Sequence, residues 1–299
     1  MEPRRGVFFA LAAFTSWGLL PVYWKLLAGI PAHEILMHRL LWTGVFAALL
    51  VVVASRGAEV RAILRSPRDL LALTASSLLL AGNWLTFIWA VNRGQIVATS
   101  LGYYLNPIVS VALGVLVLRE RLRPLQLAAV GLAAAGVVAF GVLRGELPWI
   151  ALVLASSFAL YGLIRKTVPV ASIAGIAVET GIIAPFAALA IAWREGHGAG
   201  AFSKAAALGG HKPVLLIASG VVTALPLIWF ASATRRLRLA TVGILQYIAP
   251  SIALAVAVLF YDEPFTRAHA VAFACIWTAL ALYSLETWRA SRSIDLPLN

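Results

Sequence analysis

The sequence predicts an all-α integral membrane protein with ten transmembrane helices, arranged as two five-helix repeats of inverted topology. Three observations lead to this fold class. Hydrophobic residues make up 62% of the 299 residues and charged residues only 12%. The apolar residues fall into ten runs, each about as long as a bilayer is thick. Part of the first half also recurs in the second half at a shift of 143 residues.

The composition excludes a water-soluble globular protein. Soluble domains carry about half apolar and about a quarter charged residues, so these few charges cannot cover the surface of a chain of this length. The net charge of +12 does not indicate nucleic-acid binding, because the basic residues lie in short loops between apolar runs. Such residues favour the anionic face of a membrane. The single cysteine, Cys275, supports neither an internal disulfide nor a cysteine-rich metal site.

Each apolar run is interpreted as one membrane-spanning helix. The first run lacks a cleavage pattern typical of signal peptides and is interpreted as an uncleaved helix. The sixth run is the shortest. The expected spans are residues 7–27, 34–54, 70–92, 97–118, 124–142, 148–164, 173–193, 213–233, 240–260 and 266–288.

The loop charges predict the orientation of these spans. Sixteen Lys and Arg residues lie in the loops on the side of both termini. Six lie in the opposite loops: Arg93, Arg144, Arg194, Lys204, Lys212 and Arg267. The positive-inside rule then places both termini in the cytoplasm of a bacterial-type inner membrane. Because five spans are an odd number, the repeats at 1–143 and 144–299 enter the membrane from opposite sides, as in many secondary transporters.

The repeat contains nine identities within 34 residues and needs no gap. Phe87, Ala90, Arg93, Tyr104, Pro107, Ala112, Val115, Leu116 and Glu120 recur as Phe230, Ala233, Arg236, Tyr247, Pro250, Ala255, Val258, Leu259 and Glu263. Each copy has a proline inside an apolar helix, a glutamate 13 residues later in a tight turn, and then another apolar helix.

This doubled pattern resembles the EamA domain of the drug/metabolite transporter superfamily, present twice. The N-terminal FTSWGLLPVYWK and the following HEILMHRLLW resemble the RarD-type branch. The resemblance covers nearly the whole chain and implies a ten-helix permease with a central cavity. It also implies export of small metabolites, with amino-acid exporters of the YddG type among the characterised relatives. Export of drugs such as chloramphenicol-type compounds is the alternative that it leaves open.

The matched prolines are candidate hinges. Proline removes a helical hydrogen bond and kinks the helix, so Pro107 and Pro250 are expected to bend the fourth and ninth spans at related points. A purely structural role is the alternative, since prolines are common in transmembrane helices. Glu120 and Glu263 are interpreted as structural turn residues, because a carboxylate is favoured near a helix N-terminus.

Polar and aromatic residues within the spans are candidates for the substrate site. Aromatic rings offer apolar surface and attract an ammonium group, and a tyrosine hydroxyl adds a polar contact. The alternative is that these rings pack between helices with their hydroxyls on backbone carbonyls. The candidates are Trp17, Asn83, Trp84, Tyr103, Asn106, Tyr161, Gln246 and Tyr247.

Charged residues within the spans leave several roles open. Arg39 either pairs with Glu34, snorkels to the surface, or offers its guanidinium to a substrate carboxylate. His38 either couples protons or forms hydrogen bonds between helices. Glu179 either relays protons or pairs with the basic residues that follow the sixth span, Arg165 and Lys166.

The motifs favour a carrier over an enzyme, a pump or a channel. The sequence has no GxxxxGKS/T phosphate loop and no GxSxG or HExxH motif. His33 and His38 are five residues apart and so point about 140° apart on a helix, which excludes a shared zinc ion. Rings of charge typical of channels are also missing. We therefore expect a small-molecule carrier without cofactor or metal, surrounded by the lipid bilayer and functional as a monomer.

Overall fold

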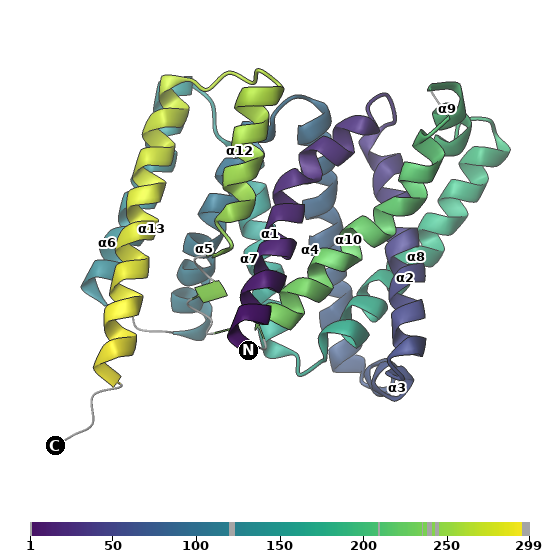
Figure 1. Ribbon diagram of the computed structural model, residues 1–299, viewed down its shortest axis with the longest axis horizontal. Coiled ribbons are helices and arrows are strands. Elements are labelled where there is room, and N and C mark those ends of the chain that lie inside the picture. Colours follow the sequence, from purple (N-terminus) through teal and green to yellow (C-terminus); the bar gives the residue numbers. More distant parts are fainter. Residues whose placement is uncertain are drawn as a thin grey trace.

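A computed structural model of the protein describes residues 2–119, 123–208, 210–234, 236–237, 241–242 and 245–294. In these ranges helices are the only regular secondary structure (Figure 1). They are α1 (Glu2–Leu26), α2 (Ala32–Val53), α3 (Gly57–Arg65), α4 (Pro67–Asn92), α5 (Ile96–Leu118), α6 (Pro124–Arg144), α7 (Trp149–Thr167), α8 (Ser172–Gly196), α9 (Ala201–Leu208), α10 (Lys212–Thr234), α12 (Ile248–Phe260) and α13 (Arg267–Ile294).

The apolar runs of the sequence correspond to helices of the bundle. Eight helices are long and apolar enough to cross a membrane: α1, α2, α4, α5, α6, α8, α10 and α13. Two shorter apolar helices, α7 and α12, lie where the sixth and ninth spans were expected. Large apolar side chains such as Leu71, Leu116 and Val142 point outward and are exposed. A bilayer would cover them, so the prediction of an all-helical membrane protein is confirmed at this level.

Two short helices lie in segments that the sequence analysis treated as loops. Helix α3 joins α2 to α4, and its Ile63 is buried against Leu73 and Val178. Helix α9 lies in the Gly- and Ala-rich segment between α8 and α10. Figure 1 shows α3 and α9 at opposite ends of the bundle, which we call the α3 end and the α9 end. Helix α1 begins and α13 ends toward the α3 end, so both lie on one side as expected.

The ninth span is shorter than predicted. A continuous helix over 240–260 was expected, but Gln246 and Tyr247 form a turn and α12 begins only at Ile248. Pro250 has no N–H to donate to the carbonyl of Gln246, which a regular helix would require. Pro250 therefore occupies the first turn of α12. Its counterpart Pro107 lies inside the continuous helix α5.

The packing of the helices repeats when the halves are exchanged. By sequence shift, α1, α2, α4, α5 and α6 correspond to α7, α8, α10, α12 and α13. Helix α5 packs on α7 as α1 packs on α12, and α4 packs on α7 as α1 packs on α10. Likewise, α2 packs on α10 as α4 packs on α8. Two helices also pack on their own counterparts in the other half: α2 packs on α8, and α6 packs on α13. Figure 1 shows α6 and α13 together at one flank of the bundle.

Small residues let the helices of different halves approach closely. A Cβ atom added to Gly102 of α5 would lie 3.0 Å from the backbone of Ala151 in α7. A Cβ atom at Gly220 of α10 would collide with the backbone of Trp42 in α2. These contacts hold the two halves together through backbone packing, which is the usual means of helix association in membranes.

Candidate functional site

Arg39 lies inside the bundle with its charged group over the rings of two tryptophans. It belongs to the second turn of α2, and only 3% of its surface is exposed. Its guanidinium carbon lies 4.9 Å from the centre of the Trp24 ring and 3.9 Å from that of the Trp84 ring. Trp24 comes from α1 and Trp84 from α4, so three helices meet at this cation. The planar guanidinium favours such stacking on aromatic faces.

The Arg39 guanidinium has no acidic partner in the part of the chain that the structure describes. Its Nε and Nη1 atoms are buried and form no hydrogen bond there. The hydroxyl groups of Tyr23 and Tyr103 are near enough to interact with the charge electrostatically. Of the roles that the sequence left open, pairing with Glu34 and snorkelling to the surface are therefore both absent.

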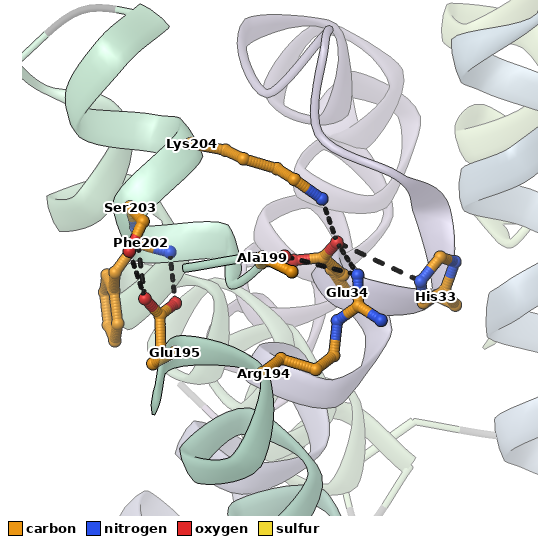
Figure 2. A network of polar contacts seen from close by, with 8 residues as sticks. All are labelled: His33, Glu34, Arg194, Glu195, Ala199, Phe202, Ser203 and Lys204. Carbon is orange, nitrogen blue, oxygen red and sulfur yellow. Dashed lines mark hydrogen bonds and ion pairs between the residues drawn. The ribbon is translucent and has the colours of Figure 1, made fainter. Parts of the chain in front are cut away.

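Glu34 instead connects α2 to the α9 end of the second half. Figure 2 shows its carboxylate facing two basic side chains. Oε1 accepts hydrogen bonds of 2.7 Å from both Arg194, near the end of α8, and Lys204 of α9. His33 Nε2 lies 4.0 Å from the same oxygen. Glu34 is 2% exposed, so this is a buried negative charge held by two cations.

A second carboxylate fixes the start of α9. Glu195 accepts hydrogen bonds from the backbone N–H groups of Phe202 and Ser203, at 2.7 and 3.2 Å. The Ser203 hydroxyl also donates to it at 2.7 Å (Figure 2). Since free N–H groups at a helix N-terminus favour an anion, Glu195 stabilises α9 in place. Helix α9 is thus attached both to α8 and, through Glu34, to α2.

His38 lies beside this ion cluster and apart from the two rings that stack on Arg39. It is 1% exposed, and its ring contacts Phe202 edge-on at a centroid distance of 4.6 Å. Neither ring nitrogen has a hydrogen-bond partner among the described residues. The interhelical hydrogen bond that the sequence suggested for His38 is therefore not formed in this part of the structure.

A row of aromatic rings continues from Arg39 into the bundle. Tyr103 of α5 contacts Phe87 of α4 at 5.6 Å and Phe158 of α7 at 6.5 Å between ring centroids. Phe158 in turn contacts Tyr161 at 5.7 Å. Asn106 lies one helical turn beyond Tyr103, and its Oδ1 atom is buried without a partner in the described chain. Tyr103 and Tyr161 are thus connected through the ring of Phe158.

Two other candidates have contacts elsewhere in the bundle. Trp17 packs against Phe14 and Phe230, with centroid distances of 5.6 Å to each. Asn83 is 1% exposed and donates to the Leu154 carbonyl at 3.0 Å and to the Ser157 hydroxyl at 2.9 Å. Asn83 therefore joins α4 to α7.

Tyr247 belongs to a separate aromatic cluster between α5, α12 and α13. Its ring stacks on that of Tyr104 with a centroid distance of 6.0 Å and an angle of 13°. Tyr104 also shares a hydrogen bond with Ser251 and contacts Phe273 and Trp277. Tyr247 is therefore packed against another aromatic ring in this cluster. Its neighbour Gln246 lies in the turn before α12 and is half-buried.

The turn glutamate Glu263 lies at the N-terminus of α5. Its two carboxylate oxygens each accept a 2.9 Å hydrogen bond, from the backbone N–H groups of Ile96 and Val97. Glu263 precedes α13, so a turn of the second half stabilises the start of a helix of the first half. Its repeat counterpart Glu120 lies outside the described residues.

Glu179 of α8 forms the ion pair that the sequence left open. Its carboxylate lies 3.7 Å from Arg165 of α7 and accepts a 2.6 Å hydrogen bond from Ser76 of α4. Ser77 donates to the Glu179 carbonyl at 2.6 Å. Glu179 therefore joins three helices through compensated contacts.

The sequence analysis missed the partners that complete these groups. Trp24 falls within the expected first span and was not a candidate site residue. Nothing in its spacing indicates that it contacts Arg39. Arg194 and Lys204 were counted as loop charges, although they meet Glu34 from 160 and 170 residues away. Among the described residues, no three of His, Cys, Asp and Glu gather into a possible metal site.

Comparison with known proteins adds the family. Residues 4–142 match the EamA-like transporter family. An uncharacterized transporter of Pseudomonas aeruginosa is 44% identical over 98% of this chain and 98% of its own length. Protein RarD of Escherichia coli is 41% identical over 95% of both chains. A second Pseudomonas aeruginosa relative, the chloramphenicol-sensitive protein RarD, is 34% identical over 96% of each chain.

A solved structure is similar in fold. The crystal structure of a protein that is 20% identical in sequence to this chain aligns with it at a TM-score of 0.57. The alignment covers 95% of this chain and 98% of the other chain. At this identity the similarity concerns the fold alone.

Proposed function

The chain belongs to the EamA-like transporter family, among its RarD-type members, and from that membership we propose that it exports small metabolites by alternating access. Amino acids with neutral or aromatic side chains are the proposed substrates. The pathway runs between two inverted five-helix repeats, 1–143 and 144–299. The ten helices comprise the eight long spans together with α7 and α12, and both termini face the cytoplasm. The protein acts as a monomer without a cofactor.

The exchange of packing partners between the halves is the observation that supports this mechanism most. Helices α1 and α7 each pack on two helices of the opposite half in a matching pattern. Inverted repeats of this kind can exchange conformations, and that exchange opens a central site to each side of the membrane in turn. The aromatic residues agree with the correspondence, because Phe14 and Trp17 of α1 recur as Phe158 and Tyr161 of α7.

Residues at which the halves differ are proposed to recognise the substrate. Tyr103 and Asn106 of α5 correspond to Gln246 and Ala249 around the start of α12. A chiral substrate requires such an asymmetric set of contacts, whereas residues common to both halves serve the motion. The buried Oδ1 atom of Asn106, which lacks a partner in the described chain, supports a role in binding.

Pro107 and Pro250 are proposed as the hinges of this motion. Pro107 leaves the Tyr103 carbonyl without a helical donor inside α5, and Pro250 marks the start of α12. We expect Pro107→Ala and Pro250→Ala each to change the transport rate in proteoliposomes. Unchanged rates in both single variants would remove the hinge role.

Export of drugs is the second candidate function. One relative is named for chloramphenicol sensitivity, and that name is the specific observation that favours it. Chloramphenicol carries no carboxylate, so it separates the two candidates chemically.

The test is flux through purified protein in liposomes. The liposomes are loaded with labelled amino acids or with labelled chloramphenicol, with and without a pH or Na⁺ gradient. Amino-acid flux that needs neither gradient is expected. Chloramphenicol flux without amino-acid flux would favour the drug alternative, and no flux of either compound would contradict both proposals.

A further inference from the structure

We propose that Arg39 binds a single carboxylate of the transported substrate, so that the substrates are monocarboxylates with an apolar or aromatic body. This inference rests on the proposed transport function and specifies the chemistry of its site. It starts from the charges that the bundle buries. Four side chains of the Asp, Glu, Lys and Arg types are buried among the described residues: Glu34, Arg39, Glu179 and Glu263.

Three of these four charges are compensated within the protein. Glu34 meets Arg194 and Lys204, and Glu179 meets Arg165. Glu263 accepts two backbone hydrogen bonds at the N-terminus of α5. Arg39 alone among the four has neither an ion pair nor a hydrogen bond to balance its charge in the described chain. The bundle therefore carries one unbalanced positive charge in its interior.

The contacts that Arg39 does make are too weak to balance its burial. A cation–π contact is weaker than the hydration that a cation loses on burial, and each buried donor left without an acceptor adds to that cost. Two tryptophans thus offset only part of the cost. A bound anion would offset the rest.

The geometry selects a planar anion with one charge. Trp24 and Trp84 lie over the guanidinium, so hydrogen bonds are left to its two edges, Nε–Nη2 and Nη1–Nη2, in which Nε and Nη1 have no partner in the described chain. A carboxylate matches such an edge with two parallel hydrogen bonds. A phosphate dianion would bring a second negative charge, and the nearby cations Arg194 and Lys204 are already bound to Glu34.

The surroundings select an apolar or aromatic body for the ligand. The rings of Tyr103, Phe158 and Tyr161 continue from Arg39 into the bundle and offer aromatic surface. The free Oδ1 atom of Asn106, one turn from Tyr103, can accept a hydrogen bond from an ammonium group. An aromatic amino acid carries a chemical group for each of these three elements, whereas a carboxylate without an amino group carries only the first two.

The experiment measures the thermal unfolding of purified protein with four related ligands. L-phenylalanine and 3-phenylpropanoate carry the carboxylate, whereas phenethylamine and L-phenylalaninamide do not. We expect the first two to raise the melting temperature of the unchanged protein and the last two to leave it unaltered. Without ligand, Arg39→Gln is expected to be at least as stable as the unchanged protein, because an uncompensated charge is removed.

Three variants complete the design. Arg39→Gln is expected to lose the response to carboxylates, with an affinity about 10- to 100-fold lower, equivalent to one charge-assisted hydrogen bond pair. Arg39→Lys keeps the charge but loses the planar edge and is expected to respond more weakly. Arg93→Gln removes an exposed cation stacked on Trp89 and is expected to respond like the unchanged protein.

The outcomes separate this inference from the proposed function. Equal stabilisation by phenethylamine, an unaltered response of Arg39→Gln, or no response to either carboxylate would overturn the role of Arg39. Amino-acid flux whose KM is unchanged in Arg39→Gln would overturn it too and would leave the proposed function standing. Arg39-dependent stabilisation by carboxylates without any amino-acid flux would support the site and contradict amino-acid export.

Discussion

Single residues in this bundle show how differently buried charges are stabilised. Glu263 relies on backbone N–H groups, Glu179 on an arginine and a serine, and Glu34 on two cations. A buried carboxylate needs such donors because it loses its hydration. Arg39 contacts aromatic rings only, and so it differs from the three carboxylates in having no hydrogen-bond partner in the described chain.

Glu263→Gln should destabilise the protein by about 1–2 kcal/mol. The amide keeps one acceptor but places an NH2 group against the second backbone donor, and the charge at the N-terminus of α5 is lost. Thermal unfolding in detergent measures the change. The matched control is Glu146→Gln, which removes an exposed carboxylate paired with Arg144. Equal melting temperatures for the two variants would contradict the stabilising role of Glu263.

Among the elements, α9 is attached to the rest of the bundle by several charged contacts. It has only eight residues, and it is attached through Glu195 at its start and through Lys204 to Glu34. Helices this short are marginal without tertiary contacts. The α9 end of α2 and α8 is therefore closed by charged contacts that can open without unpacking the main helices.

Glu34→Gln should release α9 while the long helices remain folded. The cost is expected to be about 1–2 kcal/mol, less than for a fully buried pair, because Arg194 and Lys204 are 25% and 36% exposed. Trypsin should then cleave after Lys204 faster than in the unchanged protein. Glu59→Gln, which breaks an exposed pair with Arg56 in α3, serves as control. Cleavage at the same rate in all three proteins would be the contrary result.

At the scale of the whole molecule, corresponding positions of the two halves are packed differently. A Cβ atom at Gly18 of α1 would lie 2.7 Å from Cβ of Ile252 and 2.9 Å from the Ala249 carbonyl oxygen. Gly162 of α7, which corresponds to Gly18 at a shift of 144, has open space around it. If the two halves exchange conformations, Gly162 becomes the close contact in the opposite state.

Filling the space at Gly162 should therefore block transport without unfolding the protein. Gly162→Leu is expected to keep its melting temperature but to reduce flux about 5- to 150-fold, because overpacking the opposite state costs about 1–3 kcal/mol. Gly18→Ala is expected to lower the melting temperature instead. Gly82→Ala, which also faces open space, is the control for both measurements. Normal flux through Gly162→Leu would exclude this exchange of contacts.

Much of the fold followed from local pattern. The apolar runs matched described helices to within a few residues, except where a turn at Gln246 and Tyr247 precedes α12 and where α3 and α9 formed in expected loops. The candidate site was only partly predictable. Arg39, Trp84 and Tyr103 were candidates by residue type, but Trp24 completes their group through contacts that no spacing encodes.

The sequence by itself determined that this chain is a helical membrane protein, where its helices lie, and that its halves correspond. These properties follow from hydrophobicity and helix geometry, which act over a few residues. Only the tertiary structure decided which charges are paired. Glu34 is bound by residues from the other half and Arg39 is left between two rings, because partners 15 to 170 residues apart meet only when the helices pack. The unpaired charge, and with it the proposed carboxylate site, belongs to that packing.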